Sequence, residues 1–156
     1  MTRIDYFDNS DAPAVNSLVP AASAVITNKK GHILLIRRKD NNLWALPGGA
    51  MEIGENIKET IIREVKEETG FDIAITRLVG IYTSPRHIIA FSDGEVRQEF
   101  SICFAGKVIG GKLQTDEESF EARFFTTKEA KNQPMSDSTR LRIDNYLARR
   151  SQPHIY

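Results

Sequence analysis

The segment GAMEIGENIKETIIREVKEETGF, residues 49–71, joins a glycine-rich loop to a predicted helix that carries three closely spaced glutamates. Glu64, Glu67 and Glu68 follow the i, i+3, i+4 spacing, which brings side chains onto one face of an α-helix. Like charges at this spacing destabilise an isolated helix by about 0.2–0.5 kcal/mol per pair. This face is therefore either solvated surface or part of a site that binds a cation.

Local signals predict both ends of this helix. Asn56 is a suitable N-cap, and Glu59 three residues later completes a capping box. Gly70 follows the last turn, where a left-handed conformation is common. The apolar stripe that we expect to face the core is formed by Ile57, Ile61, Ile62 and Val65. The three glutamates flank this stripe on one side.

The chemistry of the glutamates favours a hard divalent cation. Mg²⁺ and Mn²⁺ prefer oxygen ligands, and no His or Cys shares the glutamate face, which argues against Zn²⁺. Glu52 and Glu55 in the preceding loop join these three, so five of the six glutamates in residues 52–68 gather around the loop and this helix face. A phosphoric anhydride suits such a site, because its cleavage requires charge neutralisation and an activated water. The alternative is a solvated helix face with an ordinary Arg63–Glu67 pair.

The rest of the sequence predicts an α+β fold with a mixed sheet between helices. Apolar or alternating runs predict strands at residues 21–27, 32–38, 71–83, 96–109 and 121–127. The first two are joined by NKKG, which is typical of a hairpin. A C-terminal amphipathic helix is predicted within residues 136–150, with Ser136 or Asp137 as its cap. Strands and helices do not alternate regularly, which disfavours a doubly wound parallel sheet.

The first nineteen residues show neither a helical nor a strand period. We expect residues 1–19 to form an N-terminal arm or loop and residues 20–156 to form a single domain. Such an arm could exchange between the subunits of a homodimer.

Composition narrows the classes of partner. The chain has 156 residues, of which 40% are hydrophobic, and 21 basic residues balance 21 acidic ones. This balance provides no broad basic surface for a nucleic acid polymer or an anionic membrane. No run approaches the ~20 apolar residues that cross a bilayer. Cys103 has no partner in the chain for a disulfide, which fits a reducing compartment, so we expect a soluble, cytoplasmic protein that binds a small molecule.

The segment 49–71 resembles the Nudix box, G-x5-E-x7-R-E-U-x-E-E-x-G-U, in which U is a bulky apolar residue. Phe71 is aromatic where an aliphatic residue is more common. All fixed positions are filled, by Gly49, Glu55, Arg63, Glu64, Glu67, Glu68 and Gly70, and such a match rarely arises by accident. The resemblance implies a Nudix-type α/β/α sandwich. It also implies a metal-dependent, MutT-like pyrophosphohydrolase that cleaves the phosphoanhydride of a nucleoside diphosphate linked to another group, X.

The resemblance assigns roles to individual residues. The cofactor would be Mg²⁺ or Mn²⁺, and its ligands would be the Gly49 carbonyl, Glu64, Glu67 and Glu68, with Glu118 or Glu117 as a supplementary ligand. In the catalytic group, Glu64 would be the general base, Arg63 would orient a carboxylate through a salt bridge, and Glu55 would lie in the outer shell. In some family members the base comes from a loop beyond the box, for which the candidates are Asp116, Glu117, Glu118 and Glu121.

The identity of X is decided outside the box. Arg37, near the end of the second predicted strand, and Arg86 are the candidates for contact with substrate. Pro85 stands fifteen residues after Gly70, as in some members that hydrolyse ADP-ribose, although a turn explains a proline there equally well. ADP-ribose-like compounds, nucleotide sugars and nucleoside triphosphates are all candidate substrates. The alternative function is a non-catalytic Nudix module that senses a nucleotide.

Overall fold

Helix α1 spans Ile57–Thr69 and has the ends that the sequence predicts. The structure, a computed structural model, describes residues 2–156 apart from the side chain of Phe120. The Asn56 side chain accepts a hydrogen bond from the Glu59 N–H at 3.0 Å, and the Glu59 carboxylate accepts the Asn56 N–H at 2.8 Å. Gly70 adopts the left-handed conformation with φ 79°. The capping box and the glycine stop are therefore confirmed.

The buried face of α1 is narrower than the predicted stripe. Ile61 and Val65 are buried, as expected. Ile62 is 41% exposed, so its assignment to the stripe was wrong. Ile62 is rotated by about 100° around the helix from Ile61, which takes it off the face that packs on the sheet.

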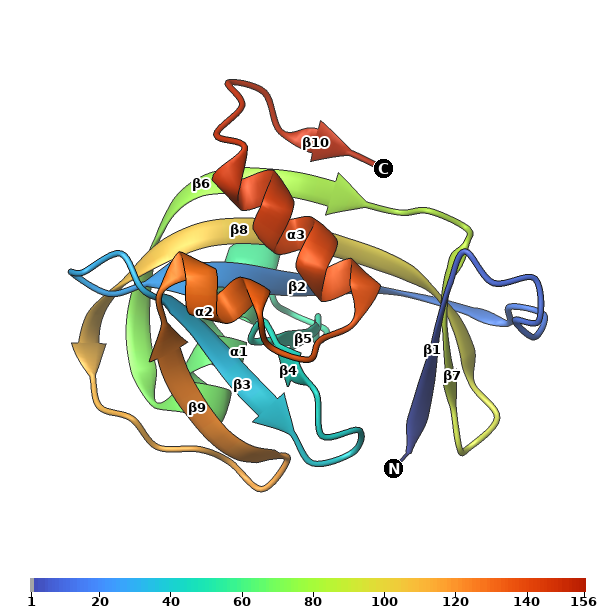
Figure 1. Cartoon of the computed structure of the whole chain (residues 1–156). Coiled ribbons are helices and arrows are strands. Elements are labelled where there is room, and N and C mark those ends of the chain that lie inside the picture. Colours follow the sequence, from blue (N-terminus) through green and yellow to red (C-terminus); the bar gives the residue numbers. More distant parts are fainter. Residues whose placement is uncertain (1) are drawn as a thin grey trace.

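Ten strands form one sheet (Figure 1). The strands are β1 (Arg3–Phe7), β2 (Ser17–Thr27), β3 (Ile33–Arg38), β4 (Trp44–Ala45), β5 (Gly48–Ala50), β6 (Phe71–Tyr82), β7 (His87–Phe91), β8 (Val96–Gly111), β9 (Ser119–Phe125) and β10 (His154–Ile155), and the other helices are α2 (Thr127–Lys131) and α3 (Asp137–Leu147). The order across the sheet is β1, β7, β8, β2, β3 and β4. In addition, β6 pairs with β8 and β10, β5 pairs with β2, and β9 pairs with β3.

Strand β8 makes the sheet mixed. It runs parallel to β2, from the pair Ser17–Arg97 to the pair Thr27–Lys107, and it runs antiparallel to β6 and β7. The hairpin predicted between β2 and β3 is present, but the Thr27–Ile33 pair is the point at which the two strands meet. Beyond it, β2 follows β8 and β5, while β3 follows β9 and β4.

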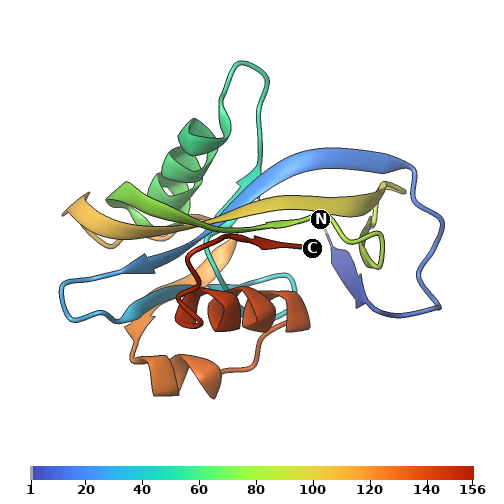
Figure 2. The same ribbon diagram turned by 90° about the horizontal axis from the view of Figure 1, so that it is seen from above.

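Helices cover both faces of this sheet. Figure 2 shows α1 on one face and α2 and α3 on the other. Neighbouring residues of a strand point to opposite faces, so β3 contributes to two cores. Leu34 packs in the core that contains Ile61 of α1, whereas Ile33 packs in the core that contains Ile143 of α3. The α+β class and the α/β/α sandwich are therefore confirmed.

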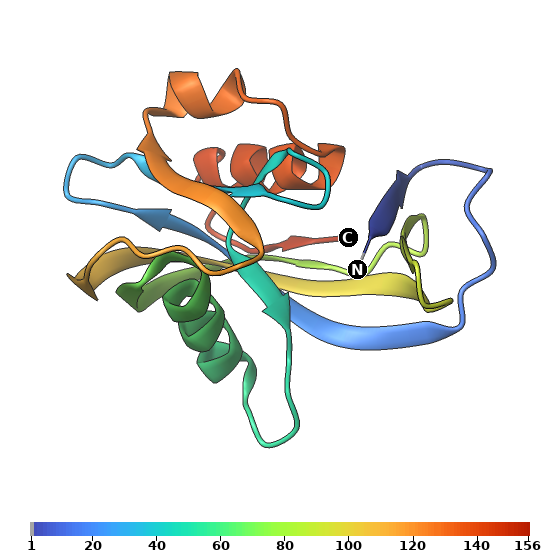
Figure 3. The same ribbon diagram turned by 90° about the horizontal axis from the view of Figure 1, so that it is seen from below.

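The N-terminal residues are not the irregular arm that the sequence suggests. Arg3–Phe7 form β1, which pairs antiparallel with β7, and β2 already begins at Ser17. In Figures 2 and 3, β1 lies on the same side of the sheet as α3. The local sequence lacks a clear strand pattern because this strand is stabilised by its distant partner. Exchange of the segment in a homodimer stays a prediction.

The shortest elements also escape prediction from the sequence. β4, β5, β10 and α2 have two, three, two and five residues, which is too short for a periodic pattern. The longer α3 begins after Ser136, one of its two predicted caps. Across the described part of the chain, no helix combines the length and the apolar character needed to span a membrane.

Candidate active site

The loop before α1 carries two glycines that lie against their neighbours. Strand β5 pairs with β2, and a Cβ atom at Gly48 would lie 2.1 Å from the Ala22 carbonyl oxygen. A Cβ atom at Gly49 would lie 2.5 Å from the Glu64 carboxylate. Such distances exclude a side chain at either position without a shift of its neighbours. The structure thus places the Glu64 carboxylate directly against the Gly49 backbone.

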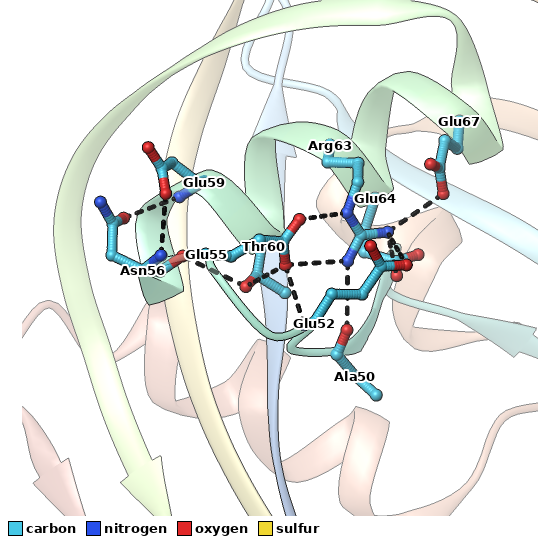
Figure 4. Close-up of polar contacts among 9 residues, drawn as sticks. All are labelled: Ala50, Glu52, Glu55, Asn56, Glu59, Thr60, Arg63, Glu64 and Glu67. Atoms are coloured by element: carbon cyan, nitrogen blue, oxygen red, sulfur yellow. Dashed lines mark hydrogen bonds and ion pairs between the residues drawn. The ribbon is translucent and has the colours of Figure 1, made fainter.

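Arg63 lies at the centre of the carboxylate cluster (Figure 4). Its Nη1 donates to Glu64 Oε1 at 2.8 Å and to Glu67 Oε2 at 3.2 Å. Its Nε donates to Glu55 Oε1, and its Nη2 donates to Glu55 Oε2 and to the Ala50 carbonyl, both at 3.1 Å. Glu52 Oε1 lies a further 3.9 Å from Nη1, so one guanidinium ties the loop to the helix and partly neutralises four carboxylates.

Glu55 is held in its ionised form. Besides Arg63, it accepts the Thr60 hydroxyl at 2.9 Å and the Glu52 N–H at 3.0 Å. These hydrogen bonds, with that of Arg63 the strongest influence, lower the pKa of Glu55 to about 2. Glu55 and Arg63 are thus a neutralised pair that fixes the loop against α1.

Glu68 and Glu64 lie in a different electrostatic setting. Glu68 is only 5% exposed, and it accepts the Gly48 N–H at 2.9 Å. Burial raises the pKa of Glu68 well above its ordinary value. Burial also raises the pKa of Glu64, although Arg63 acts in the opposite direction. An additional cation would stabilise the ionised form of both carboxylates.

These carboxylates form a loose group and not a closed metal cage. Within residues 2–156, no three His, Cys, Asp or Glu side chains converge closely enough to hold a metal ion. Arg63 Nη1 instead contacts both Glu64 and Glu67. The donor set still fits a hard divalent cation, because it consists of oxygens and includes the buried Glu68. The Glu67 side chain, which is 55% exposed, has room to turn toward such an ion.

The loop after β8 brings further negative charge to this group. The charge of Glu118 contributes to the raised pKa of Glu64, and that of Asp116 contributes to the raised pKa of Glu68. Glu117 and Glu118 are exposed. Asp116 and Glu118 therefore both lie close enough to α1 to influence its glutamates. The structure does not favour one of them over the other as the general base.

The two arginines predicted to contact substrate are engaged elsewhere in this structure. Arg37 pairs with Glu121 at 3.4 Å between neighbouring strands β3 and β9. Arg86 pairs with Asp8 at 3.0 Å, and its side chain is 76% exposed. The structure therefore does not bring either arginine to the glutamates of α1, and their substrate contacts stay predictions.

Arg38, which the sequence places beside Arg37 at the strand end as a further residue able to reach substrate phosphates, acts on the glutamates of α1. The pairing of β3 with β9 is irregular between Arg37 and Arg38. Arg38 forms an ion pair with Asp40 at 2.7 Å, and its charge acts to lower the pKa of Glu68. The signal in the sequence was the pair of adjacent arginines at a strand end.

A further group of residues lines a cavity of about 130 Å³ that reaches Gly49. We call it the polar cavity. Its lining includes Asp5 of β1, His87 of β7, Glu99 of β8 and Arg142 of α3. These residues come from four elements that are distant in the sequence, so no local pattern could have grouped them.

Comparison with known proteins places this architecture in a family. A family model described as "NUDIX domain" matches residues 17–146. The "ADP-ribose pyrophosphatase" of Methanocaldococcus jannaschii is 42% identical over 104 residues, which are 64% of this chain and 57% of that protein. The "MutT-like protein" of Streptomyces ambofaciens is 33% identical over 119 residues, which are 76% of this chain and 69% of that protein.

A solved structure supports the same fold. The "NUDIX hydrolase from Nitrosomonas europaea" superposes with a TM-score of 0.71 at 24% identity and covers 88% of this chain and 93% of its own. Our chain spans little more than half of the Methanocaldococcus relative, 57% of its length. The family match includes the whole box at residues 49–71 and most of the sheet. The chain therefore belongs to the NUDIX domain family.

Proposed function

We propose that this chain hydrolyses the phosphoanhydride bond of a nucleoside diphosphate linked to X and that it requires a divalent metal ion. The buried Glu68 carboxylate, which lies on the same helix face as Glu64, is the observation that carries this proposal. Buried carboxylates are stable as anions only beside a compensating cation. A metal ion with a diphosphate supplies that charge and the bond to be cleaved.

The protein ligands proposed for the metal are Glu64, Glu67, Glu68 and the Gly49 carbonyl, with Glu118 as a supplementary ligand. Mg²⁺ and Mn²⁺ suit these oxygen donors best. When bound, the ion would neutralise the diphosphate and lower the pKa of a water molecule.

The chain's own side chains have separate roles in this proposal. Glu64 is the general base: Arg63 holds its Oε1, and the second oxygen accepts the proton of the attacking water. Arg63 is a positioning residue, and Glu55 fixes Arg63 in place. Asp116 and Glu118 are the alternatives for the base, since both influence the pKa values of the glutamates on α1.

ADP-ribose and related nucleotide sugars are the first candidates for the substrate. The support is the relative named "ADP-ribose pyrophosphatase", at 42% identity, and the position of Pro85 in the turn before β7. Nucleoside triphosphates are the second candidate, since a relative from Bacillus subtilis, 35% identical over 95 residues, is named "Putative 8-oxo-dGTP diphosphatase".

The test is a hydrolysis assay with Mg²⁺ or Mn²⁺ against ADP-ribose, nucleotide sugars, dinucleoside polyphosphates, and normal and oxidised nucleoside triphosphates. We expect one class to be turned over strongly, and we expect Glu64→Gln to abolish that turnover. Glu129→Gln is the matched control, because Glu129 caps α2 and a glutamine preserves the capping box. Metal binding with no turnover of any substrate would favour the nucleotide-sensing module.

A further inference from the structure

The polar cavity lies on the α3 side of the sheet, and the loop that carries Gly49 separates it from the carboxylate cluster. Gly48, Gly49 and Ala50 line the cavity, while the Glu64 carboxylate lies against Gly49. A group bound in the cavity would therefore be directly next to a diphosphate held at α1. This position corresponds to one end of the substrate and not to its cleaved bond.

Two buried side chains in the lining have unused hydrogen-bonding atoms. His87 and Arg142 are each only 6% exposed. His87 Nε2 and Arg142 Nε have no hydrogen-bond partner in the described structure. Buried polar atoms are normally paired, so each unpaired atom calls for an explanation. A ligand in the cavity that both residues line would provide the missing partners.

The neighbouring side chains that the structure describes hold His87 and Arg142 in place but do not form hydrogen bonds with His87 Nε2 or Arg142 Nε. The Arg142 guanidinium stacks over the Tyr82 ring at 4.6 Å, and its Nη2 lies 3.9 Å from Glu99 Oε1, beyond hydrogen-bond distance. His87 Nε2 lies 4.0 Å from Asp5 Oδ1. Both residues are thus oriented by packing and by long-range attraction, and their hydrogen-bonding capacity is available.

The lining of the polar cavity combines side chains that only donate hydrogen bonds with side chains that only accept them. Arg142 donates, whereas the carboxylates of Asp5 and Glu99 accept. Arg3 and Arg38 also line the cavity, but each is paired with a carboxylate, Arg3 with Asp5 at 2.8 Å and Arg38 with Asp40 at 2.7 Å. The charges around the cavity are therefore balanced, and a neutral polar group fits better than a phosphate. A hydroxyl group both donates and accepts, so several hydroxyl groups on one ring satisfy both kinds of partner. The volume of about 130 Å³ is close to that of a cavity of about 150 Å³ that binds benzene, so the polar cavity has room for no more than one ring.

We propose that the polar cavity binds the hydroxylated sugar ring of X and that Arg142 and His87 determine specificity for it. This inference rests on the proposed function, because it places X next to a diphosphate at α1. It narrows X to a sugar and assigns its recognition to β7 and α3, outside the box.

The first test compares substrates that share one nucleotide but differ at the other end. ADP-ribose and ADP-glucose place a pentose or a hexose in the cavity, whereas ATP places no ring there. In Arg142→Met, we expect the ratio of kcat/KM for ADP-ribose to that for ATP to fall about tenfold, because a hydrogen bond to a charged group is lost. The change should appear in KM for ADP-ribose more than in kcat.

The matched control is Arg77→Met. Arg77 also stacks on a tyrosine, with its guanidinium 5.1 Å from the centre of the Tyr146 ring, but it does not line the polar cavity. The ratio should be unchanged in this variant. His87→Gln is the second cavity variant, in case Arg142→Met leaves Glu99 unbalanced and unfolds the protein. Equal losses for all three substrates in the cavity variants would overturn the proposal.

The second test measures binding without turnover. The chain has three histidines, so the ring nitrogens of His87 can be assigned in an NMR spectrum by comparison with His87→Gln. Ribose 5-phosphate, or glucose 1-phosphate for a hexose site, should shift the His87 signals, and inorganic phosphate should not. Unchanged signals, or the same shift with inorganic phosphate, would refute the sugar site. An inactive enzyme whose His87 still responds to the sugar phosphate would instead refute the proposed hydrolysis.

Discussion

Glu55 and Glu68 belong to the same loop and helix, but their carboxylates have opposite environments. Glu55 accepts hydrogen bonds from Arg63, the Thr60 hydroxyl and a backbone N–H, and its pKa falls to about 2. Glu68 is buried beside the Gly48 N–H, and burial raises its pKa. Two glutamates at fixed positions of one motif therefore differ in what balances their negative charge: Arg63 balances Glu55, whereas Glu68 has a backbone N–H as its partner.

This difference in environment indicates that Glu55 stabilises the structure, whereas Glu68 is suited to binding a cation. Glu55 is balanced by a cation that belongs to the chain, so its ionised form helps to hold the loop against α1. The negative charge of Glu68 is balanced less fully by the chain, as its raised pKa shows. A bound cation would therefore stabilise the ionised form of Glu68 more than that of Glu55. Removal of each charge should affect stability in opposite directions.

The largest effect is expected from Arg63→Met, which removes the cation shared by four carboxylates. Breaking this half-buried ion-pair network should lower the free energy of unfolding by about 2 kcal/mol, between the effects of exposed and of buried pairs. Urea denaturation at neutral pH without metal measures this change. Arg97→Met is the control, because within residues 2–156 the ion pair of Arg97 is with one carboxylate, that of Glu95 at 2.8 Å, while its guanidinium stacks on the Phe91 ring. If both variants lose the same stability, the central role assigned to Arg63 is wrong.

A smaller effect of opposite sign is expected from Glu68→Gln. Without metal, the loss of a buried charge should raise the free energy of unfolding by about 1 kcal/mol. The melting temperature of the native protein should rise on addition of Mg²⁺, and that of the variant should respond much less. Glu129→Gln should leave the Mg²⁺ response intact. A normal response in Glu68→Gln would remove Glu68 from the proposed ligands.

The smallest effect is the contribution of Glu55 to acid stability. A pKa of about 2 in the folded protein lies below the ordinary value of about 4.3. Ionised Glu55 therefore stabilises the fold above the ordinary pKa, and this contribution is lost as the pH falls toward 2. Melting temperatures of the native protein and Glu55→Gln should converge over that interval. Parallel curves would show that Glu55 gains nothing from Arg63.

The sequence predicted those parts of the site that depend on local spacing. The ends of α1 follow from Asn56, Glu59 and Gly70, whose interactions reach only a few residues along the chain. The ion pairs of Arg63 with Glu64 and Glu67 are likewise local, at i+1 and i+4. The α+β class followed from the order of the strands and helices.

The parts that sequence reasoning missed depend on contacts between distant segments. β1 is a strand because it pairs with β7, and the residues Arg3–Phe7 contain no local pattern that predicts this pairing. His87 and Arg142 meet in the polar cavity because strand pairing and helix packing bring β7 and α3 together. Their roles could not be read from residues 49–71, which supply the chemistry but not the substrate recognition.

The parallel pairing of β2 with β8 also has a consequence for folding kinetics. Residue 17 pairs with residue 97, and residues 21–23 of β2 pair with residues 101–103 of β8. The chain between the paired residues must lose conformational entropy before the strand contacts form. Pairing between strands so distant in the sequence is therefore expected to form slowly. Ala21, Ser23 and Ser101 line the polar cavity, which is therefore completed only when this pairing closes. The single tryptophan, Trp44, lines the same cavity, so we expect its fluorescence to change when the cavity is completed during folding.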